Sequence, residues 1–171
     1  MKKAAGFTLT ELLIVVGLIA ILAAIAVPGF SSLIRSNRVV GAAEELQNVL
    51  TYARSEAMAR GVNVGVTAPN VDAWTGALIV ATVSSTVLGE AETLRSFTNT
   101  GLAASGVNST GTAAALTFRP NGTLVSSAAA TINVCASNDK TTTGRTLTIT
   151  QGGQISMKDF PPTSAKASGC S

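Results

Sequence analysis

The chain has 171 residues, of which 46% are hydrophobic and only 12% are charged, so we expect one folded core and no extended disorder. It carries 12 Lys or Arg against 9 Asp or Glu, and this formal net charge of +3 is too small to indicate a nucleic-acid partner by itself. The sequence contains no histidine, which excludes the Ser-His-Asp and Cys-His catalytic sets and the His-containing zinc sites. We therefore expect a non-enzymatic protein with no catalytic residue, resident metal or cofactor.

An apolar run lies close to the N-terminus. Residues 12–27 contain no polar side chain, and with Phe7 to Glu11 in front the stretch reaches 21 residues. As a helix it would be about 31 Å long, enough to cross the hydrocarbon core of a bilayer. A cleavable secretory signal is the alternative, because Lys2 and Lys3 are basic and Ala24-Ile25-Ala26 resembles a small-x-small cleavage site.

Glu11 favours a retained membrane helix over a disposable signal. A carboxylate inside an apolar helix costs about 2.5 to 3.5 kcal/mol on insertion scales, and such a charge normally has a functional partner. A buried carboxylate has to be neutralised by a cation, and a terminal amine of a neighbouring helix is a candidate. The alternative is that Glu11 extends to the headgroup region without a partner.

An amphipathic helix is expected to continue the apolar one to about residue 60. Apolar residues recur at helical spacing on one face, whereas Arg35, Arg38, Glu45 and Glu56 lie on other faces. Gly61 after Arg60 is typical of a helix C-terminus. Pro28 predicts a break or kink, because proline lacks a backbone donor and clashes with the preceding turn.

The remainder of the chain is a series of short segments typical of β-strands, separated by turn residues. The expected strands cover residues 62–66, 77–83, 93–97, 116–119, 131–135, 145–150 and 154–157. Residues 98–115 are rich in Gly, Ser, Thr and Ala, and we expect a long loop there. The predicted fold class is α+β, with one face of an antiparallel sheet packed on the amphipathic half of a long helix.

Cys135 and Cys170 are the two cysteines of the chain. A membrane segment at the N-terminus indicates that the following domain is exported, and in an oxidising compartment the two should form a disulfide. Closing this loop would stabilise the fold by about 3 to 4 kcal/mol in the chain-entropy model. A metal or catalytic role is the weaker alternative, because no histidine or third cysteine is present to complete a site.

The segment from Gly6 to Leu13, which reads GFTLTELL, resembles the processing site of the type IV pilin-like proteins. In that family a membrane peptidase cuts after the glycine and methylates the new N-terminal amine. The resemblance implies a leader of residues 1–6, an N-methylated Phe7, a membrane and assembly helix over residues 7–28, and a periplasmic α+β head over residues 29–171. Glu11 would set the register between helices by pairing with the terminal amine of a neighbouring subunit, and Pro28 falls where many pilins have a helix-bending proline.

Later segments resemble the subgroup that contains the H-type minor pseudopilin of type II secretion and the FimT and FimU minor pilins. These segments are residues 42–46 and 52–57, Trp74-Thr75-Gly76, residues 116–122, residues 144–149 and the pair Gly152-Gly153. The resemblance implies a fibre subunit of the bacterial inner membrane, with one membrane pass and a periplasmic head, that enters a pilus or pseudopilus. Its partners would be other major and minor pilins, the prepilin peptidase and the membrane.

Two functions within this subgroup stay open beside a minor pilin that starts assembly at or near the tip of a type IV pilus. One is the H-type pseudopilin of a type II secretion system. The other is capture of double-stranded DNA, which some FimT proteins perform through a Gly-Arg-x-Arg motif. Here Gly144-Arg145-Thr146 is followed by Leu147, so the second arginine is missing, and Arg145 and Lys158 are the candidate DNA contacts.

Overall fold

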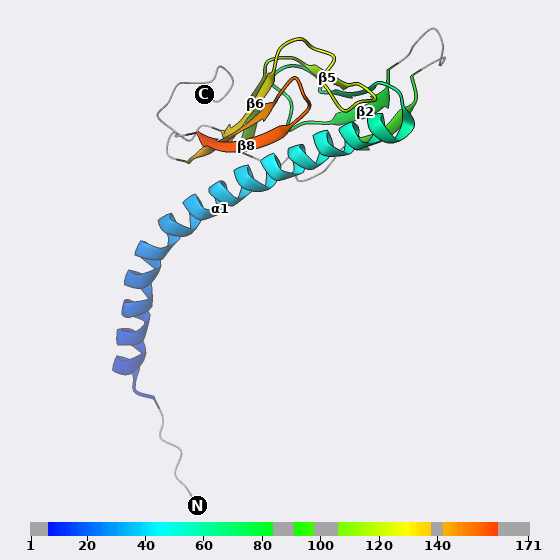
Figure 1. Cartoon of the computed structure of the whole chain (residues 1–171). Helices are drawn as coiled ribbons and strands as arrows, with labels where there is room; N and C mark the ends of the chain where they lie inside the picture. The colour runs from blue at the N-terminus through cyan, green and yellow to red at the C-terminus, as the bar shows by residue number, and fades with distance from the viewer. Residues whose placement is uncertain (1–6, 84–90, 98–105, 138–141, 161–171) are drawn as a thin grey trace, which may run out of the picture. The chain divides into compact units, whose positions relative to one another are not determined.

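A computed structural model describes residues 7–83, 91–97, 106–137 and 142–160, with the side chains of Val27, Pro28 and Phe160 excepted. One long helix precedes eight strands (Figure 1). The elements are α1 (Leu9–Arg60), β1 (Val64–Thr67), β2 (Leu78–Thr82), β3 (Thr93–Phe97), β4 (Val107–Gly111), β5 (Ala115–Phe118), β6 (Ala130–Ala136), β7 (Gly144–Ile149) and β8 (Ile155–Phe160). The long helix followed by antiparallel strands confirms the predicted fold class.

The chain divides into two compact units, residues 1–34 and 35–171, and α1 contributes to both. The backbone is helical without interruption from Leu9 to Arg60, so Pro28 does not break the helix. The kink at Pro28 stays a prediction. Helix α1 ends at Arg60 as predicted, where the backbone N–H of Gly61 donates to the carbonyl of Ala57.

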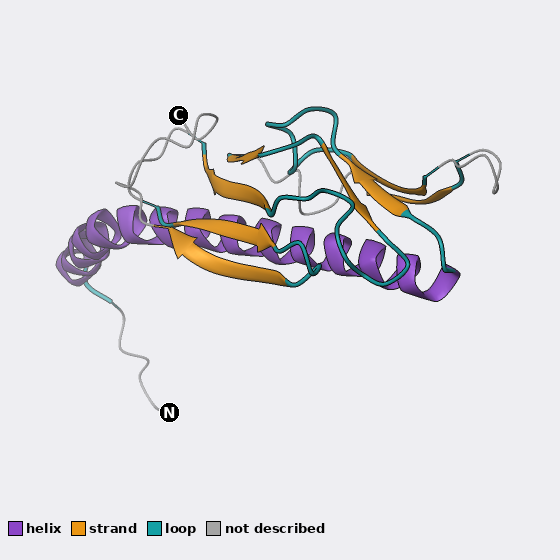
Figure 2. Cartoon of the chain, turned by 45° about the horizontal axis from the view of Figure 1, so that its top comes forward, coloured by secondary structure: helices purple, strands orange, loops and turns teal. Residues whose placement is uncertain are grey.

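Within the second unit, one face of α1 is buried. Its apolar residues follow one another at three- and four-residue steps, which places them on a single stripe of the helix. The buried residues are Val39, Ala42, Ala43, Leu46, Val49, Leu50, Ala53 and Ala57. All the strands lie on one side of this part of the helix in Figure 1, and in Figure 2, with this side turned forward, some of them pass in front of the helix. Full burial of a leucine side chain contributes about 1.5 to 3 kcal/mol, so Leu46 and Leu50 anchor the strands to the helix.

The strands form two four-stranded antiparallel sheets, where we expected one. The first sheet has the order β3-β2-β1-β5 and the second the order β4-β6-β7-β8. In each sheet alternate side chains point into the core, as the two-residue period of a strand requires. In the first sheet these are Val64, Val66, Leu78, Val80, Leu116 and Phe118, and in the second Ile132, Val134, Leu147 and Ile149.

All seven predicted strands are present, but the expectation of one long loop over residues 98–115 is wrong. Residues 107–111 form β4, which pairs with β6 from Val107↔Ala136 to Gly111↔Ile132. The sequence Val-Asn-Ser-Thr-Gly has low hydrophobicity because β4 buries only Val107 and Ser109. Residues 98–105 of the expected loop lie outside the described residues.

The segment of residues 70–76 explains why a polar strand is stable at this sheet edge. The Ser109 hydroxyl accepts a hydrogen bond from the backbone N–H of Thr75 at 2.8 Å, and the N–H of Gly111 donates to the carbonyl of Val71 at 2.6 Å. The fully buried Trp74 donates from Nε1 to the carbonyl of Ala113 at 2.9 Å. A side chain at Gly111 would overlap the Trp74 ring, so the indole packs directly on the strand backbone.

A second close contact joins the helix to both sheets. Arg54 of α1 donates from Nε to the carbonyl of Gly122 at 3.0 Å, in the turn that follows β5. The turn between β7 and β8 packs against the same carbonyl, since a Cβ at Gly153 would overlap the Gly122 oxygen. The backbone N–H of Leu124 also donates to the carbonyl of Gln151 at 3.0 Å. We call these three residues, Arg54, Gly122 and Gly153, the turn junction.

We predict that Gly153→Ala destabilises the protein, whereas Gly152→Ala does not. Gly153 has a φ of 77°, which costs a residue with a Cβ about 1 to 2 kcal/mol, and the overlap with Gly122 adds to this. Thermal unfolding followed by circular dichroism should show a midpoint lowered by at least about 4 °C.

Gly152→Ala is the matched control, because the nearest atom to its Cβ would be the Thr150 hydroxyl at 3.9 Å. Equal midpoints for Gly153→Ala and Gly152→Ala would show that the turn junction does not constrain the backbone.

Candidate assembly site

The first turn of α1 is capped by a side chain. The Thr8 hydroxyl accepts a hydrogen bond from the backbone N–H of Glu11 at 3.2 Å, and the same hydroxyl lies 3.5 Å from Glu11 Oε2. Thr8 is therefore the N-cap residue and Glu11 the third residue of the helix, which is the Thr-x-x-Glu pattern of a capping box. A carboxylate at this position also interacts favourably with the positive end of the helix dipole.

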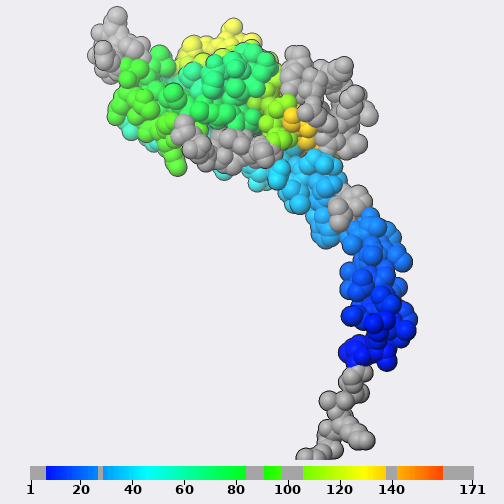
Figure 3. Space-filling model, turned by 180° about the vertical axis from the view of Figure 1, so that it is seen from behind, coloured from blue at the N-terminus to red at the C-terminus, as the bar shows by residue number. Residues whose placement is uncertain are grey.

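The helix surface that follows Glu11 is apolar and exposed. Large apolar side chains between Phe7 and Ile25 are between 44% and 82% exposed, and in Figure 3 this segment is the blue surface. An 18-residue window of α1 reaches a mean hydropathy of 2.8, with none of it buried. By length and composition, α1 is the one helix of the described residues that is able to cross a membrane. Such a surface requires an apolar environment.

The processing site predicted from the sequence, Gly6-Phe7, falls at the start of this segment. Phe7 is 82% exposed and precedes the capped first turn, whereas Gly6 and the rest of the leader lie outside the described residues. The Thr8 hydroxyl contacts both the backbone N–H and the carboxylate of Glu11, so this carboxylate lies in the first turn of the helix. The sequence analysis missed Thr8, although Thr-x-x-Glu ahead of an apolar run is a recognisable helix-start signal.

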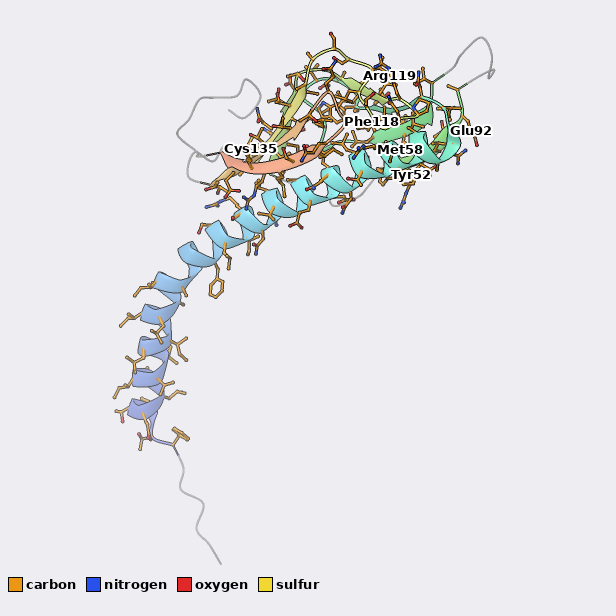
Figure 4. All side chains as sticks on the ribbon, in the orientation of Figure 1. Tyr52, Met58, Glu92, Phe118, Arg119 and Cys135 are labelled. Atoms are coloured by element: carbon orange, nitrogen blue, oxygen red, sulfur yellow. The ribbon has the colours of Figure 1, made fainter. Side chains whose placement is uncertain are left out.

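Of the two cysteines, the structure describes Cys135. Cys135 is buried on β6 (Figure 4), and Cys170 lies outside the described residues. On β6, Cys135 follows Val134, which pairs with Arg145 of β7. Cys135 therefore lies opposite Gly144, and Gly144 pairs with Phe160 at the end of β8. Cys135 and Phe160 are thus about 10 Å apart across two strand spacings.

The two candidate DNA contacts point to opposite faces of the second sheet. Arg145 has the same strand parity as the buried Leu147 and Ile149, whereas Lys158 is paired with Thr146 on the other face. The guanidinium of Arg145 forms an ion pair with Asp159, its partner in the ladder, and its side chain is 23% exposed. The geometry therefore gives Arg145 and Lys158 no common surface for DNA.

No cluster of three or more His, Cys, Asp or Glu with metal-binding geometry occurs among the described residues. The 410 Å³ groove beside β5 is lined by small and apolar residues and lacks a nucleophile with an adjacent base.

Comparisons with known proteins agree with this description. A family model described as Type II transport protein GspH matches residues 42–153, and a prokaryotic N-terminal methylation motif matches residues 1–27. Two crystal structures of the type IV minor pilin FimU from Pseudomonas aeruginosa are similar to this chain. One is 34% identical with a TM-score of 0.62 over 78% of this chain and 96% of its own, and the other 33% identical with a TM-score of 0.58 over 75% and 98%.

The structure of the minor pseudopilin EpsH from Vibrio cholerae is 14% identical, with a TM-score of 0.49 over 75% of this chain and 99% of its own. No curated protein sequence matches the chain at a significant level. The fold and the methylation motif define a non-catalytic protein of the type IV pilin-like class. Within that class, the chain belongs to the GspH family of minor pilins and pseudopilins.

We predict that Arg145→Ala leaves the salt dependence of any binding to duplex DNA unchanged, because Asp159 already neutralises this cation. Lys158→Ala should lower the salt slope by about one unit if Lys158 contacts a phosphate. Titrating the head, residues 29–171, with duplex DNA at several salt concentrations measures both slopes.

Asp159→Asn is the matched control, since it releases Arg145 from the ion pair and should strengthen binding at low salt. A one-unit loss for Arg145→Ala would instead show that the ion pair opens on DNA.

Proposed function

We propose that this protein is a minor pilin of a type IV pilus that helps to start assembly at or near the fibre tip. The observation that carries the proposal is the 34% identity to a type IV minor pilin over 78% of this chain. Coverage of 78% of the chain extends well beyond the N-terminal motif of residues 1–27. The exposed apolar surface of α1 supports the proposal, because neighbouring helices in a fibre supply the apolar environment that the membrane supplies before assembly.

A role as the H-type minor pseudopilin of a type II secretion system is the second candidate. The observation in its favour is the match of residues 42–153 to the GspH family model. The two roles share the processing site, the membrane helix and the fold, and differ in the fibre that the head joins. Deleting the gene separates them: loss of surface pili with normal secretion supports the first role, and loss of secretion with normal pili supports the second.

Before assembly, the chain would be a single-pass protein of the bacterial inner membrane with its head in the periplasm. Its partners would be the prepilin peptidase and then other major and minor pilins. The proposed mature N-terminus is Phe7, four residues before Glu11. Glu11 lies in the first turn of the helix, and we expect its carboxylate to pair with the terminal amine of a neighbouring subunit and so to set the axial register.

The disulfide between Cys135 and Cys170 is also part of the proposal. Nine residues separate Phe160 from Cys170, and an extended chain of this length reaches about 30 Å. The distance from Phe160 to Cys135 across the sheet is only about 10 Å, so the bond requires no change in the strands. It would hold the C-terminal segment against the second sheet in the oxidising periplasm.

We predict that the mature protein begins with an N-methylated Phe7. We expect cleavage by the prepilin peptidase, because the basic Lys2 and Lys3 and the Gly6-Phe7 junction directly precede the apolar helix. Mass spectrometry of the protein from membranes gives the mature N-terminus. A chain that begins at Val27 would instead identify residues 1–26 as an ordinary secretory signal.

We predict that Glu11→Gln impairs assembly but not folding, insertion or removal of the leader. Glutamine at the third helix position still fits a capping box, so the substitution removes the charge and leaves the helix start intact. Loss of a charge-assisted hydrogen bond costs about 1.5 kcal/mol, which corresponds to roughly tenfold less protein in fibres.

The ratio of protein in sheared fibres to protein in membranes, compared with the wild type, measures this effect. An unchanged ratio would show that Glu11 is only a tolerated charge at the membrane interface.

A further inference from the structure

Asn121 is the one asparagine of the chain that is followed by a glycine. In such a pair no side chain hinders the backbone nitrogen of the glycine when it attacks the side-chain amide, and asparagine is for such reasons a thermolabile residue. Asn121 is exposed, and no described residue accepts a hydrogen bond from its Nδ2 atom. The leaving group of this reaction therefore lies in solvent.

The turn that follows β5 requires both members of this pair. Gly122 has a φ of 76°, and a Cβ at this position would lie 2.9 Å from Sδ of Met58, so a side chain does not fit. Oδ1 of Asn121 accepts hydrogen bonds from the backbone N–H of Thr123 at 3.1 Å and from its hydroxyl at 2.7 Å. The reactive pair is thus a consequence of the turn itself.

The closed turn keeps the two reacting atoms apart. The N–H of Gly122 donates to the carbonyl of Arg119 at 2.8 Å, so Pro120 and Asn121 are the central residues of a β-turn. With proline at the first central position the turn is of type I or II, and the second central residue then has a ψ of about 0°. This ψ places the Gly122 nitrogen over the backbone nitrogen of Asn121, whereas ring closure requires it over Cβ. Cyclisation therefore needs a rotation of the peptide unit between the two residues.

The turn junction opposes this rotation. The carbonyl of Gly122 accepts a hydrogen bond from Nε of Arg54 at 3.0 Å, and Gly153 packs against the same carbonyl. Rotation of the preceding peptide unit breaks the bond to Arg119 and moves this carbonyl away from both contacts. Local openings of a folded protein have their own free energies, so the rate of cyclisation depends on the fraction of molecules in which the turn junction is open.

We propose that Asn121 is a site of spontaneous deamidation that the turn junction controls, unreactive while the junction is closed and reactive with water once it opens. In the open turn the Gly122 nitrogen forms a bond to Cγ of Asn121, the Cγ–Nδ2 bond breaks, and ammonia leaves with the proton of the Gly122 N–H. Water then opens the resulting succinimide ring, either at Cγ to give aspartate or at the backbone carbonyl to give isoaspartate. Neither step changes an oxidation state.

The two products have different effects on the turn. In isoaspartate the main chain runs through Cβ and Cγ of residue 121, so it is one atom longer. The carbonyl of Gly122 then cannot return to Arg54 and Gly153 while the N–H of Arg119 keeps its 2.8 Å hydrogen bond to the carbonyl of Thr123. Aspartate leaves the backbone unchanged, and its carboxylate accepts the same hydrogen bonds from Thr123. Isoaspartate therefore holds the turn junction open, whereas aspartate allows it to close.

Peptide mapping by mass spectrometry measures the deamidation of Asn121 in the full chain held in detergent. The folded wild type should react slowly, and the same chain should react much faster in urea, where the turn is lost. Arg54→Met removes the donor to Gly122 and should raise the rate in the folded protein by at least about tenfold, as expected for a charged donor. Thr123→Val removes the hydroxyl that holds Oδ1 and should raise it about two- to tenfold.

Arg95→Met is the matched control, because it makes the same substitution on β3, at the opposite edge of the first sheet from β5. Arg95 lies over the rings of Tyr52 and Phe97, and its variant should react at the wild-type rate. If circular dichroism shows that Arg54→Met is unfolded, Thr123→Val gives the answer. A wild-type rate for Thr123→Val, or equal acceleration by Arg95→Met and Arg54→Met, overturns the proposal.

Ion-exchange chromatography separates the deamidated protein, because each product carries one more negative charge. Thermal unfolding should show a lowered midpoint for the isoaspartate form and the wild-type midpoint for Asn121→Asp. Equal midpoints for these two proteins overturn the proposal, and so do equal deamidation rates of the wild type with and without urea. None of these measurements involves a fibre, so the proposed function stands or falls separately.

Discussion

The carbonyl of Gly122 is the point at which the helix and the two sheets meet. It accepts a hydrogen bond from Arg54 of the helix and follows β5 of the first sheet, and the turn between β7 and β8 of the second sheet packs directly on it. Among the described residues, no strand of one sheet pairs with a strand of the other. The turn junction therefore joins both sheets to the helix.

The two parts of helix α1, which has 52 residues, require different surroundings. Its C-terminal part has one apolar stripe that the sheets bury, whereas residues 12–26 are apolar all round and exposed. A helix that is apolar on every side needs an apolar environment on every side. A lipid bilayer and a bundle of similar helices both meet this requirement, which is why one helix suits a membrane precursor and a fibre subunit.

The distribution of charge over the sheet edges connects the fold to assembly. A fibre subunit is surrounded by other chains at high local concentration, where every unprotected edge strand invites pairing. Charged side chains on β3 and β8 and the segment of residues 70–76 beside β4 protect these three edges, and residues 124–131 run beside the fourth edge, β5. The edges of the head are thus protected against unspecific strand pairing.

The sequence by itself determined the helix, its end at Arg60 and seven strands, because these depend on local periodicity and turn residues. It also indicated the family, since Gly6, Phe7 and Glu11 lie in one short continuous motif.

The tertiary structure alone decided the division into two sheets and the existence of β4, whose polar residues are stabilised by the segment around Trp74 and not by their own pattern. It also decided the pairing of Arg145 with Asp159 and the contact of Gly153 with Gly122. These contacts bring together residues that are 14 to 39 positions apart, and local sequence pattern carries no information at that range.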